Sequence, residues 1–164
     1  MNTPKVTIIT AVLNGEKHIE DTIKSIVSQD YGNFEYIIID GGSTDRTVDI
    51  IKRYEDKIKF WVSERDKGIS DAFNKGLKAS SGEYINFQGD GDRLFAFDTL
   101  SKVFRNHNSN HDTFISGRIE RVSEEGGSLF LSKFINDFDK KSLLFKLSIP
   151  HQGLFTHKSF YEKY

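Results

Sequence analysis

The sequence predicts a three-layer α/β fold built around a mainly parallel sheet. Short apolar runs, rich in β-branched residues, alternate with longer segments in which apolar residues recur every three or four positions. The first pattern is typical of strands covered on both faces, and the second of helices that pack one side on a sheet. Strands and helices in alternation form parallel sheets through right-handed crossovers. A chain of 164 residues is long enough for one such domain.

The first two strand and helix units occupy the amino-terminal third. Residues 5–13 are a nearly continuous apolar run and are predicted to form the first strand. Isoleucines at helical spacing predict a helix over 16–29, and residues 34–40 are predicted to form the second strand. In the following GGSTDRT tract, Ser43 or Thr44 is expected to cap a second helix. Its inward side chains are expected to be Val48, Ile51 and Tyr54.

Two further strands and one helix continue this alternation. Residues 58–63 are predicted to form the third strand, and residues 69–79 the third helix. The helix is expected to turn Ile69, Ala72, Phe73 and Leu77 inward. Residues 82–94 are predicted to contain a fourth, buried strand with Tyr84, Ile85 and Phe87. It runs into Asp90 and Asp92, which alternate with glycines and mark a sharp turn.

The alternation weakens after Asp92, and the remaining elements are shorter. A helix is predicted for 95–106, with Leu100, Val103 and Phe104 buried. Two strands joined through SEEGG have the pattern of a hairpin. The predicted ranges are 113–122 and 128–133 for these strands, 138–147 for an amphipathic helix, 149–155 for an extended segment, and 159–164 for the start of a helix capped by Ser159.

The composition excludes several classes of protein. Cysteine is absent, which excludes disulfides, zinc–thiolate sites and a thiol nucleophile. The formal net charge is −1 and the basic residues are spread along the chain, so a nucleic-acid binder is not expected. The longest apolar runs have the length of strands, and the polar start MNTPK lacks the apolar core of a signal peptide. These features predict a cytoplasmic protein.

Polar residues follow each of the four predicted strands. The carboxyl ends of parallel strands meet at one edge of a sheet, and open sheets of this kind bind ligands there. We therefore expect a binding site at this edge. The polar residues in question are Thr10 and Asn14, Asp40, residues 63–66, and the pair Asp90 and Asp92.

The pair Asp90 and Asp92 has two interpretations. Aspartate and glycine are the commonest turn formers, so the pair can be an ordinary acidic turn. Two neighbouring carboxylates can also hold Mg²⁺ together with substrate phosphate oxygens. The sequence LNGEKH after the first strand is neither of the usual glycine-rich phosphate motifs. An acidic edge without such a cradle would repel a diphosphate unless a cation neutralised it, which favours a metal together with an anionic nucleotide.

Several linked motifs resemble one known family. TIITAVLN at 7–14, IIIDGGSTDRT at 37–47, SERDKGISDAFNKGLKASSGEYINF at 63–87 and GD at 91–92 occur in the order found in family 2 glycosyltransferases. The segment 149–164 also resembles a later part of such domains. The resemblance covers most of residues 5–95 and implies the GT-A fold, a three-layer, Rossmann-like fold with a mainly parallel sheet. The glycine–aspartate form of the last motif resembles the polysaccharide-assembly type.

The resemblance implies transfer of a sugar from a nucleotide-diphosphate donor to an acceptor hydroxyl, with inversion and with Mn²⁺ or Mg²⁺ at the diphosphate. Asp92 matches the last carboxylate of the family's metal motif, and Asp40 the aspartate that binds the base. Three roles are open for Asp90: a ligand of the metal, a contact of the donor ribose, or a purely structural role in the turn. The other implied contacts are Thr10, Ala11 and Asn14 beside the base, Asp66 and Asp71 at the donor, and His151 and Gln152 on the acceptor side.

The resemblance also implies how the chain is divided. Residues 1–164 are expected to form one domain, in which 1–95 bind the nucleotide sugar and 96–164 form part of the acceptor side. An inverting transferase needs a general base, and the family's base would lie beyond Tyr164. The chain as given is therefore expected to be truncated at its carboxyl end, to bind the donor nucleotide weakly or not at all, and to transfer no sugar.

The acceptor is expected to be a glycan or a lipid-linked molecule. In the second case the amphipathic segment 138–147 could contact the inner face of the membrane.

Two other functions are open for the protein. One is a non-catalytic module that binds nucleotide sugars. The other is a sugar nucleotidyltransferase, which would normally carry a glycine-rich, basic loop in place of LNGEKH.

Overall fold

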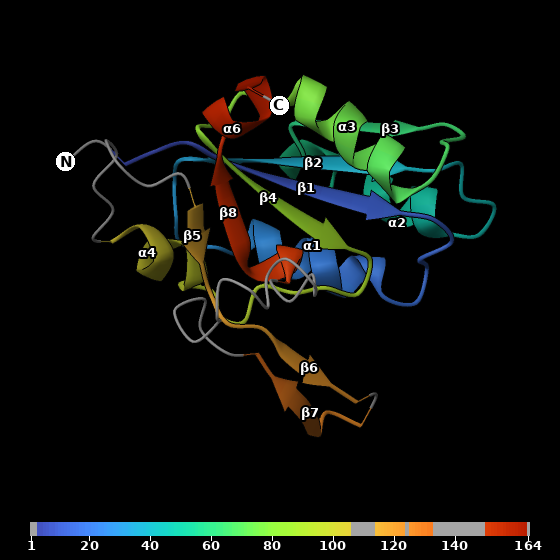
Figure 1. Ribbon diagram of the computed structural model, residues 1–164. Coiled ribbons are helices and arrows are strands. Elements are labelled where there is room, and N and C mark those ends of the chain that lie inside the picture. The colour runs from blue at the N-terminus through green and yellow to red at the C-terminus, as the bar shows by residue number, and fades with distance from the viewer. Residues whose placement is uncertain (1–2, 106–113, 124, 133–149, 164) are drawn as a thin grey trace, which may run out of the picture.

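The computed structural model describes residues 3–105, 114–123, 125–132 and 150–163 (Figure 1). Within these ranges the main sheet has six strands in the order β3-β2-β1-β4-β8-β5. The first four strands in the chain are parallel to one another, whereas β8 is antiparallel to both β4 and β5. This confirms the α/β fold with a mainly parallel sheet. The strands are β1 (Val6–Val12), β2 (Phe34–Asp40), β3 (Phe60–Ser63), β4 (Tyr84–Gly89), β5 (Phe114–Ser116) and β8 (Leu154–His157).

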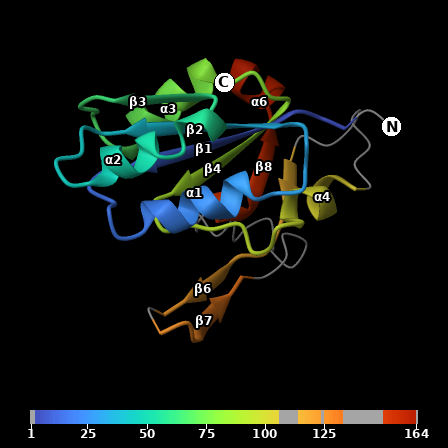
Figure 2. The same ribbon diagram turned by 180° about the vertical axis from the view of Figure 1, so that it is seen from behind.

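Helices cover both faces of the sheet and complete the three layers (Figures 1 and 2). The side chains of Ile8 and Ile38 belong to the apolar cluster that contains the residues of α1 and α2. Ile9 and Ile37 belong to a second cluster, with Ala72 of α3. This alternation explains why nearly every residue of these strands is apolar. The helices are α1 (Ile19–Val27), α2 (Thr47–Lys52), α3 (Ile69–Ala79), α4 (Thr99–Phe104) and α6 (Ser159–Lys163), with a 3₁₀ turn η1 (Glu55–Lys57) after α2.

Helix α3 lies unusually close to β1 because position 76 is glycine. A Cβ atom at Gly76 would lie 2.3 Å from Cγ2 of Ile9, a branch of a fully buried side chain. We expect Gly76→Ala to lower the free energy of unfolding by about 1–3 kcal/mol through overpacking, although alanine has the better helix propensity. Urea unfolding measures this. Gly32→Ala is the matched control because no atom lies within 4 Å of its added Cβ, and an equal loss in both variants would contradict the prediction.

Three predicted helix starts differ from the structure. The first is that of α1, which begins at Ile19 rather than at 16. Helix α2 begins at Thr47 after Arg46, so the prediction of Ser43 or Thr44 as its cap is wrong. The Ser43 hydroxyl instead donates a hydrogen bond to Asp40. Helix α4 begins at Thr99 rather than at 95, and Phe95 is 88% exposed. Ile69, predicted to face inward, is 56% exposed at the start of α3.

The range predicted as one strand over 113–122 is divided between two sheets. Its first part is β5 in the main sheet, and its second part is β6 (Glu120–Val122), which pairs with β7 (Ser128–Leu131) in the predicted hairpin. The hairpin projects from the body of the protein (Figures 1 and 2). The division occurs at Gly117, whose N–H donates to the carbonyl oxygen of Gly153 at 2.7 Å.

The segment predicted as extended over 149–155 contains a turn. A 3₁₀ turn, η3 (His151–Gly153), precedes β8, which runs back along β4. The amphipathic helix predicted for 138–147 lies outside the described residues. No helix in the described ranges combines the length and apolar character that crossing a membrane requires.

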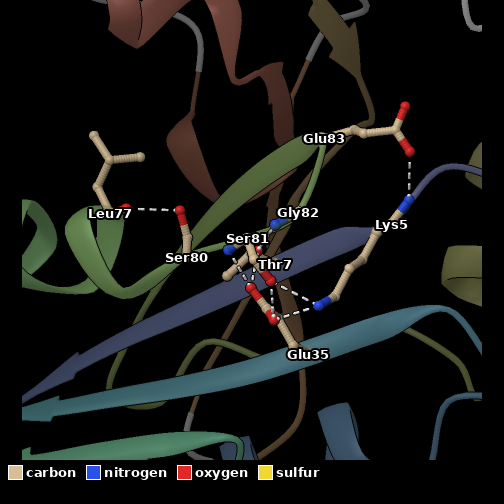
Figure 3. A network of polar contacts seen from close by, with 8 residues as sticks. All are labelled: Lys5, Thr7, Glu35, Leu77, Ser80, Ser81, Gly82 and Glu83. Carbon is tan, nitrogen blue, oxygen red and sulfur yellow. Dashed lines mark hydrogen bonds and ion pairs between the residues drawn. The ribbon is translucent and has the colours of Figure 1, made fainter.

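A partly buried ion pair fixes the amino-terminal edge of the sheet (Figure 3). The Glu35 carboxylate lies 2.7 Å from Lys5 Nζ and accepts hydrogen bonds from Thr7 Oγ1 at 2.7 Å and from the Ser81 N–H at 2.6 Å. The Gly82 N–H donates in turn to Thr7 Oγ1 at 2.9 Å. These contacts join β1, β2 and the turn that leads from α3 into β4.

Candidate functional site

The predicted site lies at the carboxyl edge of the parallel strands, opposite this ion pair. Two of its predicted residues lie within β1. Thr10 is fully buried, and its hydroxyl accepts a hydrogen bond from Tyr36 Oη at 3.0 Å. Ala11 is buried in the apolar cluster beneath α3. The structure therefore places both side chains in the core, behind the loops that form the edge.

Asp40 is fully buried at the end of β2, and its carboxylate is surrounded by donors. Oδ2 accepts hydrogen bonds from the backbone N–H groups of Gly42 at 3.2 Å and Ser43 at 2.9 Å, and from Ser63 Oγ at 2.5 Å. Oδ1 accepts one from the Ser43 hydroxyl. The carboxylate thus lies beside two serine hydroxyls, which can rotate. The sequence signal for Ser43 was the Asp-x-x-Ser spacing of a side-chain-stabilised turn.

Asn14 links the loop after β1 to the loop after β2. Its backbone is in the left-handed region, with φ of 53°. Its N–H donates to Ser43 Oγ at 2.7 Å, and its Oδ1 accepts from the Thr44 N–H at 2.9 Å. The Gly15 N–H donates to Thr47 Oγ1 at 2.8 Å in the same interface. These contacts make the two loops one connected wall on the Asp40 side of the site.

Asp66 lies against the same wall from the loop after β3. Its Oδ1 accepts a hydrogen bond from the Gly68 N–H at 2.9 Å. A Cβ atom at Gly41 would lie 2.8 Å from its Oδ2, so the glycine makes room for this carboxylate. The structure thus brings Asp66 next to the loop that carries Asp40.

Asp71 lies in the first turn of α3 and stabilises the loop before it. Its Oδ2 accepts a hydrogen bond from the Lys67 N–H at 3.1 Å, which lowers the pKa of this carboxyl together with the nearby Lys75 ammonium. Lys75 Nζ lies 3.6 Å from Asp71 and 2.8 Å from Glu64. Its charge is therefore already matched by two carboxylates.

Asp90 is half-buried, and its side chain lies under the loop after β1. A Cβ atom at Gly15 would lie 2.5 Å from its Oδ2. Its Oδ1 is buried and has no hydrogen-bond partner within the described residues. Burial raises the pKa of the Asp90 carboxyl. The nearby carboxylates of Asp45 and Asp92 also raise it, whereas His18 lowers it.

Asp92 closes a tight turn at the end of β4. Its N–H donates to the Gly89 carbonyl at 3.2 Å, and its Oδ2 accepts from the Gly89 N–H at 2.6 Å. Gly91 provides the left-handed conformation that the turn requires, with φ of 86°. The carboxylate is therefore oriented by the backbone, and its other oxygen lies beside Gln152, with Nε2 to Oδ1 at 3.4 Å.

Gln152 reaches Asp92 because buried amides hold the turn η3 against β4. Asn86 Nδ2 and Gln88 Nε2 each donate to the Gln152 carbonyl oxygen at 3.0 Å. Asn86 and Gln88 were not among the predicted site residues, although two amides within the apolar strand YINFQG were a visible signal. His151 points elsewhere, and its ring lies 6.0 Å from that of Phe73 on α3.

The donor set at Asp92 fits a cation that a substrate also binds. Within the described residues there is no group of three His, Cys, Asp or Glu side chains that could enclose a metal ion. Mg²⁺ sites of nucleotide enzymes do not need one, because one or two protein groups are completed by phosphate oxygens and water. Asp92, with one oxygen held by the Gly89 N–H and the other beside the Gln152 amide, is such a group.

Curated relatives cover nearly the whole chain. An uncharacterised glycosyltransferase of Haemophilus influenzae is 34% identical over 147 residues, which are 88% of this chain and 58% of the relative. A PGL/p-HBAD biosynthesis glycosyltransferase of Mycobacterium bovis is 31% identical over 168 residues, which are 98% of this chain and 62% of the relative. The chain thus spans about three fifths of the length of these two relatives.

Solved structures share the fold. One is the mannosyltransferase PcManGT from Pyrobaculum calidifontis, in complex with GDP-Man and Mn²⁺. The match covers 99% of this chain and 47% of the PcManGT chain, with a TM-score of 0.69 and 23% identity. Another is the 1–349 fragment of S. aureus TarS, in complex with UDP-GlcNAc. The match covers 97% of this chain and 47% of the TarS chain, with a TM-score of 0.65 and 18% identity. Both are GT-A glycosyltransferases, so the predicted GT-A architecture is confirmed.

The family itself is shown by sequence. The family model described as glycosyl transferase family 2 matches residues 7–163, nearly the entire chain. The match runs from β1 through α6 and includes every motif on which the resemblance was based. The chain is therefore a member of glycosyl transferase family 2.

Proposed function

We propose that this protein binds a nucleoside diphosphate sugar at the carboxyl edge of its sheet, as the donor side of an inverting glycosyltransferase. The observation that carries the proposal is Asp92, whose carboxylate is oriented by the Gly89 N–H at the end of β4. Two of the structural neighbours were solved with GDP-Man and with UDP-GlcNAc, which supports a donor of this class. Residues 1–95 would hold the donor, and residues 96–164 would form part of the acceptor side.

The residues at the edge have separate roles in this proposal. The wall formed by Asp40 and Asn14 would hold the base and the ribose. Asp66, against the same wall, and Asp71, in the first turn of α3, would contact the donor. Asp92 would bind Mn²⁺ or Mg²⁺, which supplies Lewis-acid stabilisation of the diphosphate leaving group. Asp90, half-buried beneath the Gly15 loop, would keep that loop at a fixed distance from the turn of Asp92. His151 would face the acceptor.

The acceptor is proposed to be a glycan or a lipid-linked molecule of cell-surface polysaccharide synthesis. For a lipid-linked acceptor the protein would work in the cytoplasm at the inner face of the membrane. The support for membrane contact is the β6–β7 hairpin, which exposes the apolar side chains of Leu129, Phe130 and Leu131.

Nucleotide binding tests the proposal directly. We expect UDP or GDP to bind the chain at least about tenfold more tightly in the presence of Mn²⁺, as measured by isothermal titration calorimetry. UMP and GMP are the matched controls, because they lack the β-phosphate and should gain less from the metal. If neither diphosphate binds the complete protein, with or without Mn²⁺, the proposed function is wrong.

Turnover separates the remaining alternatives. Diphosphate binding without sugar transfer by the complete protein would favour a non-catalytic binding module. Synthesis of a nucleotide sugar from a sugar phosphate would favour a nucleotidyltransferase, for which no residue of the described site gives support. Transfer from one member of a panel of nucleotide sugars would support the transferase and identify its donor.

A further inference from the structure

The turn that carries Gln152 is held in place by side chains rather than by sheet pairing. The antiparallel ladder between β4 and β8 ends at the pair Asn86 and Phe155. Beyond that pair, Asn86 Nδ2 donates to the carbonyl oxygens of Gln152 and Leu154, each at 3.0 Å. Gln88 Nε2 donates to the Gln152 carbonyl oxygen at 3.0 Å and to Asn86 Oδ1 at 2.6 Å. Three of these four hydrogen bonds hold the turn, and the fourth joins the two amides to each other.

Burial makes this arrangement rigid. Asn86 and Gln88 are 0% and 1% exposed, so their hydrogen bonds do not compete with water. The backbone of Gln152 is therefore fixed relative to the end of β4, where Asp92 lies. Only its side chain is free to change its contacts, and that side chain is directed at the Asp92 carboxylate.

The contact between the two side chains is long for a hydrogen bond but suitable for two ligands of one cation. Gln152 Nε2 lies 3.4 Å from Asp92 Oδ1, which makes this a weak hydrogen bond. Rotating the amide so that Oε1 faces Asp92 therefore costs little hydrogen-bond energy. Adjacent oxygen ligands of an octahedral Mg²⁺ ion, each at about 2.0–2.1 Å, are about 3 Å apart. An Oε1 atom in the position of Nε2 would stand close to that separation from Asp92 Oδ1.

We propose that Gln152 is a second protein ligand, through Oε1, of the divalent cation that Asp92 binds. The inference rests on the proposed function, because it assumes a cation at Asp92. Gln152 is thereby assigned to the metal and not to the acceptor. Its amide oxygen would add a neutral ligand beside the single oriented carboxylate of Asp92. Amide oxygens are ordinary ligands of hard cations, and a carboxylate at this position would bind the cation more strongly still.

Two substitutions at Gln152 give opposite results if it is a ligand. Mn²⁺ binding is measured by the loss of the free-ion electron paramagnetic resonance signal, in the presence of saturating UDP or GDP. We expect Gln152→Ala to weaken Mn²⁺ binding about tenfold and Gln152→Glu to strengthen it several-fold. Asn74→Asp makes the same amide-to-carboxylate change at an exposed position of α3, and it should leave the affinity within about twofold.

The outcomes separate this inference from the proposed function. Equal weakening in Gln152→Ala and Gln152→Glu would show that Gln152 only shapes the turn, and no change in either would show that it does not contact the metal. Both results overturn the inference while leaving Asp92 as the metal ligand. If neither the wild-type protein nor Asp92→Asn binds Mn²⁺, the proposed metal site at Asp92 is wrong. The assignment of Gln152 as its second ligand is then wrong as well. Far-ultraviolet circular dichroism of each variant verifies that the fold is retained.

Discussion

Asp92→Asn is expected to weaken Mn²⁺-dependent binding of UDP or GDP at least about 100-fold. The asparagine side chain has nearly the same shape, and its oxygen can still accept the hydrogen bond from the Gly89 N–H, so the turn is retained. What is lost is the negative charge that holds the cation against the diphosphate. Losing even an outer-shell partner of a metal costs 10- to 100-fold in affinity, and a direct ligand should cost at least the upper value. Calorimetric titration of the nucleotide with and without Mn²⁺ measures the effect.

Asp21→Asn is the matched control for this substitution. Asp21 is an exposed carboxylate on α1, and its oxygen lies 3.3 Å from a guanidinium nitrogen of Arg93, the residue after Asp92. The control removes one negative charge beside the same loop without touching the proposed ligand. Its affinity should stay within about twofold of the wild type. Unchanged Mn²⁺-dependent binding in Asp92→Asn would contradict the assignment of the metal ligand.

Glu35→Ala is expected to lower the free energy of unfolding by about 3 kcal/mol. The substitution leaves the Ser81 N–H without its acceptor and removes the partner of the Lys5 ammonium. Breaking one side of a buried ion pair costs about 3–5 kcal/mol, and the partial exposure of Lys5 places this pair at the lower limit. Urea unfolding measures the loss. Glu83→Gln is the control, because its exposed contact with the Lys5 N–H at 3.0 Å survives as a hydrogen bond to an amide oxygen.

The same residue predicts how stability changes in acid. Burial alone would raise the pKa of Glu35, but the Lys5 ammonium and the hydrogen bonds from Ser81 and Thr7 lower it from 4.5 to about 2. Because the folded-state pKa lies below the unfolded one, the stabilisation is complete above about pH 4.5 and is lost as the pH falls toward 2. Glu35→Gln should therefore be less stable than the wild type at neutral pH and show a smaller loss between pH 4.5 and 2. Parallel acid dependence in both proteins would contradict the assignment.

The elements that the sequence predicted best are those determined by local pattern. The predicted bounds of β2 and α3 coincide with those of the structure, because each carries its own apolar periodicity. The divided range 113–122 was missed for the opposite reason. Whether Phe114 or Val122 joins the main sheet depends on pairing with β8, some forty residues later, and not on the residues of the range itself.

The candidate site shows the same limit. Asp40 and Asp92 were selected from their positions after strands, and the structure places both at the expected edge. The partners that orient them were not predicted, because Ser63 and Gln152 come from other strands and loops. Thr10 was selected as a contact although its hydroxyl is used inside the core. The catalytic base, which the resemblance places beyond Tyr164, stays a prediction.

The attachment of η3 to β4 also bears on the order in which the protein folds. The contact between Gln152 and Asp92 joins residues 60 positions apart, whereas the turn that orients Asp92 spans only three. Closing the longer loop carries a larger entropic cost, and contacts of high sequence separation slow folding. The turn at the end of β4 can therefore form with its strand, while the proposed metal site is completed only when the carboxyl-terminal strand docks. Nucleotide binding should thus appear as a late step in refolding, after most of the secondary structure has formed.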